Sequence, residues 1–187
     1  MSDPTVLVVD DEPAIADAHA QWLSEEYTVK TAYDGEQALE VMDESIDVVL
    51  LDRRMPGISG DDVLNTIRDR NYDCRVAMVS AVEPNFDILE LGYDTYLVKP
   101  VSEADQLLET VETLLRRSQY DGEMQELLAL ASKKGTLEAK KTQSELEEHT
   151  EYQRLTDRLD TLYERVSSTT DDLDDDDLRA EFFELKG

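Results

Sequence analysis

Short apolar runs alternate with polar segments through the first hundred residues of the chain. These runs are rich in β-branched side chains, which is typical of strands that are buried on both faces of a parallel sheet. The segments between them carry apolar residues at helical spacing. This alternation predicts an α/β fold with a parallel five-stranded sheet and right-handed crossovers. The predicted strands are 5–9, 27–29, 48–51, 75–79 and 95–98.

The five helices between and after these strands are recognised by residues that favour a helix N-terminus. The second runs to about Met42, the fourth is short and ends at Glu90, and the fifth opens with a capping box formed by Ser102 and Asp105. His19 lies on the apolar face of the first helix, where packing is a better interpretation than ligand binding. The N-terminal markers are Pro13, Asp34, Ser59, Asn85 and Ser102.

After Arg117 the pattern changes to helices alone, so we predict two domains, 1–118 and 119–187. A short helix around Leu127 is expected to stop near Gly135. Residues 136–168 contain neither Gly nor Pro and predict one continuous helix. An apolar stripe along its second half favours either an antiparallel hairpin or a dimer. An acidic linker, 171–177, precedes a final helix, 178–185, with Phe182 and Phe183 as anchors. The stripe is Tyr152, Leu155, Leu159, Leu162 and Val166.

Composition restricts the cellular setting. No run approaches the roughly 18 apolar residues that span a bilayer, and the acidic N-terminus does not resemble a signal peptide. A single cysteine, Cys74, fits a reducing compartment. We therefore expect a soluble cytoplasmic protein without a membrane partner. With only His19 and His149 beside Cys74, we do not expect a zinc cluster.

The chain carries 45 acidic and 18 basic residues, a net charge of -27. Such a charge repels itself at ordinary salt, so it favours a halophilic source whose cytoplasm screens it, the alternative being a merely acidic protein. A polyanion of this size is also a poor non-specific ligand for nucleic acid.

Polar side chains follow four of the five predicted strands. Asp10 and Asp11 come after the first, Asp52 after the third, Ser80 after the fourth and Lys99 after the fifth. Ligands bind at the carboxyl ends of such strands, and clustered carboxylates need a cation such as Mg²⁺. A carboxylate nucleophile, a metal, a cation and a hydroxyl together are what a phosphoryl acceptor requires.

These residues give the chain a resemblance to the receiver domain of two-component response regulators over residues 4–117. The matching motifs are Asp10-Asp11, Asp52 with Met55-Pro56-Gly57, Ser80-Ala81 and Lys99-Pro100. The resemblance implies a flavodoxin-like (βα)5 domain with strand order 2-1-3-4-5. It makes Asp52 the acceptor of a phosphoryl group from a sensor histidine kinase.

The same resemblance assigns the supporting residues. Asp10, Asp11, Asp52 and the backbone carbonyl of Arg54 would hold Mg²⁺, with Asp10 acting largely through water. Ser80 and Lys99 would contact the phosphoryl group, Tyr96 would be the aromatic switch, and Lys99-Pro100 would be a cis peptide. Arg54 and the apolar Val82 depart from the family pattern, which bears on how long the phosphate survives.

The C-terminal part is similar to the HalX domain, which follows receivers in halophilic archaea. The resemblance implies a response regulator whose helical domain delivers the output, in transcriptional regulation and through protein contacts or a homodimer. Two alternatives stay open. The C-terminal domain could contact DNA directly, for which Lys133, Lys134, Lys140 and Lys141 form its basic cluster. The chain could also be a phosphohydrolase with an aspartyl nucleophile, although Arg54 occupies the place where those enzymes carry a second acid.

Overall fold

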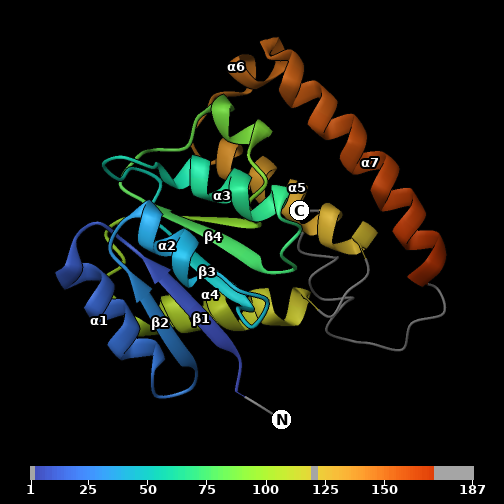
Figure 1. Cartoon of the computed structure of the whole chain (residues 1–187). Coiled ribbons are helices and arrows are strands. Elements are labelled where there is room, and N and C mark those ends of the chain that lie inside the picture. The colour runs from blue at the N-terminus through green and yellow to red at the C-terminus, as the bar shows by residue number, and fades with distance from the viewer. Residues whose placement is uncertain (1–2, 119–121, 171–187) are drawn as a thin grey trace.

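The computed structural model describes residues 3–118 and 122–170, with side chains up to residue 166. A parallel sheet of five strands in the order β2-β1-β3-β4-β5 forms its centre (Figure 1). The predicted fold class and strand order are therefore confirmed. The second strand is longer than the pattern indicated and extends to Ala32. The strands are β1 (Thr5–Val9), β2 (Thr28–Ala32), β3 (Val48–Leu51), β4 (Arg75–Ser80) and β5 (Thr95–Val98).

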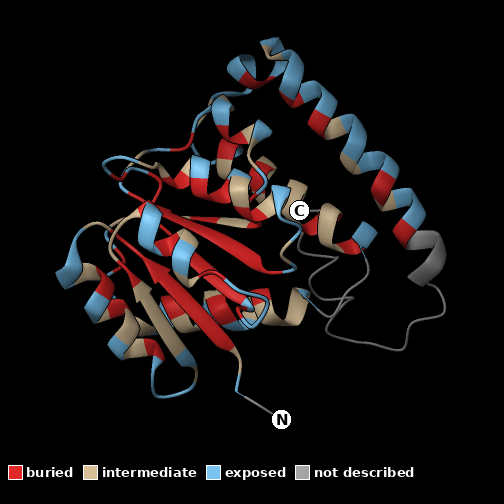
Figure 2. Cartoon of the chain, in the orientation of Figure 1, coloured by how far each residue is buried: buried red, intermediate tan, exposed pale blue. Residues whose placement is uncertain are grey.

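Helices cover both faces of the sheet. On one face α1 and α4 pack on the strand side chains that include Val8 and Leu50, and on the other α2, α3 and η1 pack on Val9 and Leu51. All residues of β1, β3 and β4 are buried, as their apolar composition predicts (Figure 2). The helices of this part are α1 (Pro13–Leu23), α2 (Gly35–Val41), α3 (Gly60–Asp69), the 3₁₀ helix η1 (Phe86–Glu90) and α4 (Ala104–Arg117).

Most of the predicted helix starts agree with the structure. Pro13 begins α1, and the Asp34 side chain accepts a hydrogen bond from the amide of Gln37. Ser59 forms a capping box with Asp62. The capping box predicted at Ser102 is wrong, because α4 starts one residue later, after Glu103, without a side-chain cap.

The C-terminal part forms three helices, α5 (Gly122–Glu138), α6 (Gln143–Glu148) and α7 (Thr150–Thr170). The predictions of a short helix ending near Gly135 and of one continuous helix over 136–168 are both wrong. Helix α5 continues through Gly135, and a capping box between Thr142 and Glu145 starts α6 within the segment expected to be continuous. The predicted final helix, 178–185, lies outside the described residues. No helix within 3–118 and 122–170 is long and apolar enough to cross a membrane.

Helices α5 and α7 pack antiparallel, as a hairpin that α6 closes. Ion pairs join Glu126 to Arg158 and Glu123 to Arg165, while Tyr152 near the start of α7 donates to Glu138 near the end of α5. An apolar cluster lies between them, so the antiparallel hairpin considered for the apolar stripe is the arrangement found. This cluster contains Met124, Leu127, Leu128, Leu162 and Val166.

The closed end of this hairpin packs against β5 and η1 of the receiver-like part (Figure 1). Leu137, Leu146 and Tyr152 belong to the same apolar cluster as the sheet and α3, and they are 0%, 2% and 9% exposed. The break between α5 and α6 turns Leu137 and Leu146 toward this cluster. Burial against the receiver-like part is thus the physical reason why the helix is interrupted.

Candidate functional site

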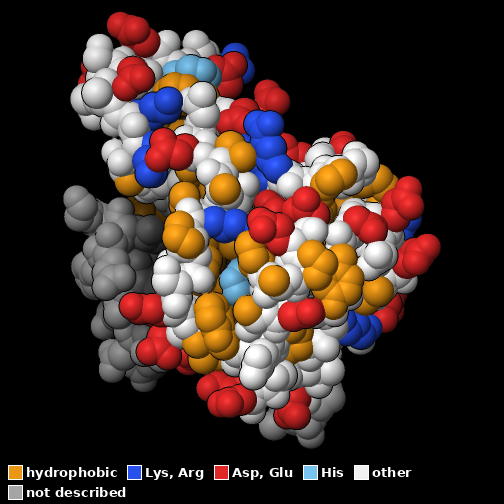
Figure 3. Space-filling view, turned by 90° about the vertical axis from the view of Figure 1, so that its left-hand side faces the viewer, with side chains coloured by type: hydrophobic (Ala, Val, Ile, Leu, Met, Phe, Trp, Pro, Cys, Tyr) orange, Lys and Arg blue, Asp and Glu red, His pale blue; other side chains and the backbone are white. Residues whose placement is uncertain are grey.

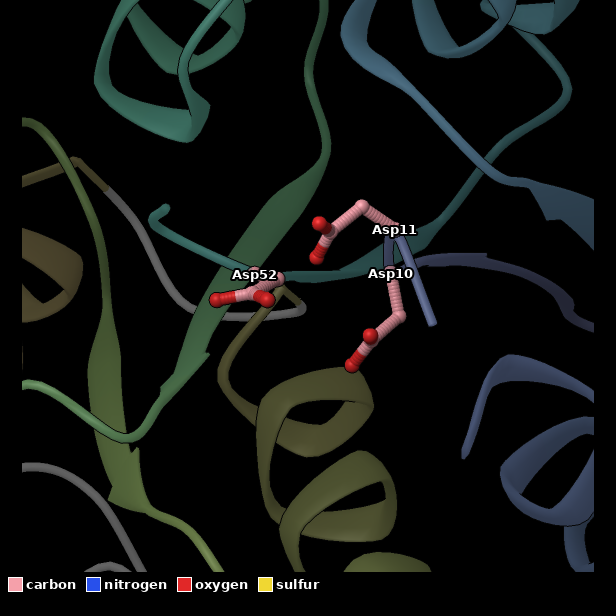
Figure 4. Close-up of side chains that lie close together, drawn as sticks. All are labelled: Asp10, Asp11 and Asp52. Carbon is pink, nitrogen blue, oxygen red and sulfur yellow. The ribbon is translucent and has the colours of Figure 1, made fainter. Parts of the chain in front are cut away.

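Three carboxylates converge at the carboxyl edge of the sheet. Val9 and Leu51 are paired in register, so the residues that follow them, Asp10 and Asp52, lie side by side. Asp10, Asp11 and Asp52 each offer a carboxylate oxygen, and these oxygens lie within 4.8 Å of one another (Figure 4). Asp10 and Asp52 are 2% and 5% exposed, whereas Asp11 is partly open to solvent. The cluster is therefore accessible from one side.

Lys99 supplies the positive charge at this cluster. Its ammonium nitrogen lies 2.6 Å from Asp10 Oδ2 and 3.0 Å from Asp52 Oδ2. The residue follows β5, and its amide donates to the carbonyl of Ser80 at the end of β4. The peptide bond between Lys99 and Pro100 is cis. One lysine thus bridges two of the three carboxylates.

The ionisation of the site reflects this burial and pairing. Burial raises the pKa of Asp52, and the hydrogen bond and charge of Lys99 oppose that rise. Burial by itself would lower the pKa of Lys99, but the hydrogen bonds to Asp10 and Asp52 leave the pKa raised. Lys99 therefore stays charged beside a carboxyl group that is costly to ionise.

His19 packs on α1 behind the site, 4% exposed, with its ring 5.5 Å from that of Trp22. Burial lowers the pKa of His19; the charge of Asp10 opposes this effect and the charge of Lys99 adds to it. A neutral, packed histidine agrees with the sequence interpretation.

Ser80 and Tyr96 both contact the segment that follows β4. Ser80 is fully buried, and its hydroxyl oxygen accepts a hydrogen bond of 3.2 Å from the amide of Val82. Tyr96 is 8% exposed and donates to the carbonyl of Val82 at 2.7 Å. The aromatic ring thus lies inward, against the segment that follows β4.

The loop after β3 encloses the Asp52 side of the site. The amide of Arg54 donates to Asp52 Oδ1 at 3.2 Å, and its side chain is exposed beside a pocket that Asp11 and Asp61 also line. Gly57 turns this loop with a φ of 76°. Gly60 lies so close to the backbone of Asp52 that a Cβ added to Gly60 would be 2.1 Å from the Asp52 carbonyl oxygen. The first residue of α3 is therefore packed directly on the backbone of Asp52.

Arg53 is a site residue that the sequence analysis missed. It is 8% exposed, and its guanidinium group pairs with Asp61 of α3 at 3.0 Å and with Asp87 of η1. Burial would lower the pKa of this group, but hydrogen bonds to both acids leave it raised. An arginine next to a buried strand gives no signal in the sequence that it will be buried, because its two acidic partners stand 8 and 34 positions away on other elements.

The donor set fits a hard divalent cation. All donors are oxygens, two carboxylates are buried, and the third faces solvent, so room remains for water and a phosphate oxygen. Among the described residues, no other group of three acidic, histidine or cysteine side chains is close enough to hold a metal.

The fold and the site define a receiver of the CheY-like class, and comparison with known proteins agrees. Residues 6–112 match the response regulator receiver domain, and residues 116–182 match the HalX domain. Because the receiver match covers more than half of the chain, this protein belongs to the response regulator receiver family.

Several relatives carry regulatory names. A Haloferax volcanii protein that is provisionally named a transcriptional regulator is 49% identical over 86% of this chain, which covers 28% of that relative. The Escherichia coli transcriptional regulatory protein CpxR is 37% identical over 64% of this chain and 53% of its own length. The chain therefore spans between about a quarter and a half of these relatives.

Solved structures match the receiver part. The response regulator TrrA from Thermotoga maritima, in complex with Mg²⁺ and BeF, is 36% identical, with a TM-score of 0.52 over 60% of this chain and 99% of that one. A CheY-like receiver from Methanospirillum hungatei is 27% identical, with a TM-score of 0.58 over 63% of this chain and 98% of that one.

Proposed function

We propose that this chain is a phosphorylation-controlled switch in which residues 1–118 receive a signal and residues 119–187 deliver it. The observation that carries the proposal is the cluster of Asp10, Asp11 and Asp52 bridged by Lys99 at the end of β3. Asp52 is the acceptor, because it follows β3, the middle strand of the sheet, and its carboxylate lies beside those of Asp10 and Asp11 and in contact with Lys99.

In the proposed reaction an oxygen of Asp52 attacks the phosphorus atom of the donor. The bond from phosphorus to the donor breaks, and an acyl phosphate forms on Asp52. The donor leaves with the electron pair, as the histidine imidazole of a sensor kinase or as acetate from acetyl phosphate. Lys99 then binds a phosphoryl oxygen, and the Ser80 hydroxyl donates to another.

Asp10, Asp11, Asp52 and the carbonyl of Arg54 would hold Mg²⁺. The ion supplies a positive charge that neutralises the carboxylates and the phosphoryl oxygens as the donor approaches. Lys99 takes part of that role before the donor arrives, since it already pairs with Asp10 and Asp52. The Mg²⁺-BeF complex of TrrA supports this assignment by similarity.

A switch fits the site better than a phosphohydrolase that turns over external substrates. Arg54 stands two residues after the nucleophile, where those hydrolases usually carry an acid, and Val82 has no polar group to orient water. We therefore assign the chain at most self-phosphorylation from small donors and loss of its own phosphate.

For the output we favour protein contacts over direct contact with DNA, in the regulation of transcription suggested by the relatives' names. The basic cluster considered for DNA is engaged within the protein. Lys134 pairs with Glu138, Lys140 pairs with Glu83, and Lys141 lies 5.6 Å from the centroid of the Phe86 ring. Lys133 is 6% exposed and donates to the carbonyl of Leu91. The location we propose is the cytoplasm, where a kinase domain can reach the site.

Acetyl phosphate tests this function. The full chain should show a shifted band in phosphate-affinity electrophoresis when Mg²⁺ is present, and Asp52→Ala should show none. Asp105→Asn changes an exposed acid of α4 that lies outside the metal cluster, so it should keep the band. A shifted band in Asp52→Ala would overturn the assignment of the acceptor.

A further inference from the structure

A cavity of about 450 Å³ lies between helix α5 and the amino edge of the sheet. One wall comes from the end of α3 and from the segments that precede β4 and β5, and the other comes from α5 (Figure 1). The carboxylates of Asp10, Asp11 and Asp52 lie at the opposite, carboxyl edge. Cavities of this size between two parts of a chain are common ligand sites. The lining includes Arg68, Asn71, Arg75, Asp94 and Lys133.

The three acidic side chains that line this cavity are all paired with arginines. Asp94 is buried and pairs with Arg68 at 3.0 Å and with Arg75 at 3.2 Å. Asp73 is exposed and also pairs with Arg75. Glu126 pairs with an arginine of α7. None of these acids is therefore left to neutralise another cation of the cavity.

Lys133 of α5 differs from the two arginines because it has no acid beside it. It is 6% exposed, donates to the carbonyl of Leu91, and its ammonium nitrogen lies 5.2 Å from the centroid of the Tyr93 ring. It forms no ion pair with a carboxylate of residues 3–118 or 122–166. Burial lowers the pKa of this ammonium group, since removal from water disfavours the charged form.

A buried ammonium group without a counterion is costly. Methionine at position 133 would cover the Tyr93 ring without that cost, and the chain has 45 acidic residues from which a partner could have come. Packing alone therefore gives no reason for a lysine here. An anion that enters the cavity does, because it would neutralise the charge of Lys133.

Donor groups remain for such an anion. Lys133 uses one of its three N–H groups in the bond to a backbone carbonyl. Arg68 uses three of its five, in bonds to Asp94 and to two backbone carbonyls. The side-chain amide of Asn71 lines the same cavity. A guanidinium group and an ammonium group together suit the oxygens of a phosphate.

We propose that this cavity binds the phosphate group of a small phosphorylated molecule, with Lys133 and Arg68 as its ligands. A phosphate fills only part of the cavity, and Ala129 and Leu130 offer an apolar wall for the organic part of the molecule. The site is separate from the carboxylate cluster, so it does not depend on the function proposed above. Because its walls belong to the receiver part and to α5, the bound molecule would hold these two parts together.

Inorganic phosphate is the probe for this site. It is titrated into the full chain at constant ionic strength in molar KCl, with EDTA in place of Mg²⁺, so that screening stays constant and no metal reaches the carboxylates. Backbone amide NMR of the unmodified chain should show saturable shifts at Gly92, Asp94 and Ala129. Shifts that do not saturate, or that are confined to the carboxyl edge around Asp52, would overturn the proposal without any variant.

Two variants then test the role of Lys133. Lys133→Met removes the charge and keeps an unbranched apolar chain over Tyr93. Lys134→Met is the matched control, because the neighbouring Lys134 pairs with Glu138 within α5. We expect Lys133→Met to bind phosphate about ten- to a hundredfold more weakly, the range of one hydrogen bond to a charged group. Lys134→Met should bind as the unmodified chain does.

Urea unfolding separates a ligand from a structural contact. Phosphate should raise the urea midpoint of the unmodified chain and of Lys134→Met, and leave that of Lys133→Met unchanged. Without phosphate, Lys133→Met should be at least as stable as the unmodified chain, because a buried charge has been removed. Equal phosphate affinity in Lys133→Met and the unmodified chain would overturn the proposal. A destabilised Lys133→Met together with no phosphate effect on the unmodified chain would show that Lys133 is only a structural contact.

Discussion

The ammonium group of Lys99 lies 3.0 Å from the carboxylate of Asp52, although 47 positions separate the two residues in the chain. In this contact Lys99 is bound to Asp52 Oδ2, an oxygen that a metal and a phosphoryl group would also approach. Lys99 therefore has two opposing effects, since it stabilises the carboxylates without a metal and repels the metal when one binds.

Replacing Lys99 by Met should tighten Mg²⁺ binding while it weakens the response to phosphorylation. At about 5 Å and an effective dielectric constant near 40, repulsion between the unit charge of Lys99 and the double charge of Mg²⁺ is roughly 3.3 kcal/mol, so we expect a gain on the order of a hundredfold. Calorimetric titration with Mg²⁺ measures it, and Lys134→Met, a remote lysine, is the control. Weaker Mg²⁺ binding in Lys99→Met would mean that Lys99 positions the ligands rather than competes with the metal.

Acidification should protonate Asp52 before ordinary carboxyl groups. Burial raises its pKa above the usual 3.8, so the folded chain binds this proton more tightly than the unfolded chain does. The stability linked to this group is thus present at low pH and lost as pH rises through the raised pKa. Carbon-13 NMR of the Asp52 carboxyl should show titration above 3.8 without metal and a downward shift when Mg²⁺ is added. A midpoint at or below 3.8 without metal would contradict the buried environment.

Much of this site could be anticipated from the chain alone. Buried strands are visible in sequence because their apolar runs are local, and the parallel register then brings Asp10 beside Asp52. The buried Arg53 could not be anticipated, because its partners Asp61 and Asp87 come close only through the packing of α3 and η1. The break before α6 was missed for a related reason, since burial of Leu137 and Leu146 on the receiver part overrides the helical propensity of the segment.

Gly135 offers a test of how α5 is built. It lies inside the helix, and an added Cβ would meet nothing within 4 Å. Gly135→Ala should therefore stabilise the chain by about 0.5–1 kcal/mol, by reducing the entropy of the unfolded state. Gly60→Ala is the opposite case, because its Cβ would clash with the Asp52 carbonyl oxygen, and it should be clearly destabilising. Urea unfolding measures both, and a destabilised Gly135→Ala would argue against a helix at this position.

Stability should rise with salt. The net charge is -27, and acidic side chains are spread over the face shown in Figure 3 rather than gathered in one patch. The Debye length falls from about 10 Å at 0.1 M salt to about 3 Å at 1 M, so molar KCl removes most of the repulsion between exposed acids. The urea midpoint should be higher in 2 M than in 0.1 M KCl. Equal midpoints would mean that ion pairs within the fold already compensate the acids, and they would weaken the inference of a halophilic source.

The central claim is that Asp52 carries the phosphoryl group, and mass spectrometry of the intact chain tests it most directly. After incubation with acetyl phosphate and Mg²⁺, the mass should rise by a single phosphoryl group that hydroxylamine removes, as expected for an acyl phosphate. Asp52→Asn should show no increase, and chelation of Mg²⁺ should abolish the increase in the unmodified chain. An unchanged mass for the unmodified chain, or a phosphoryl group retained by Asp52→Asn, would contradict the account.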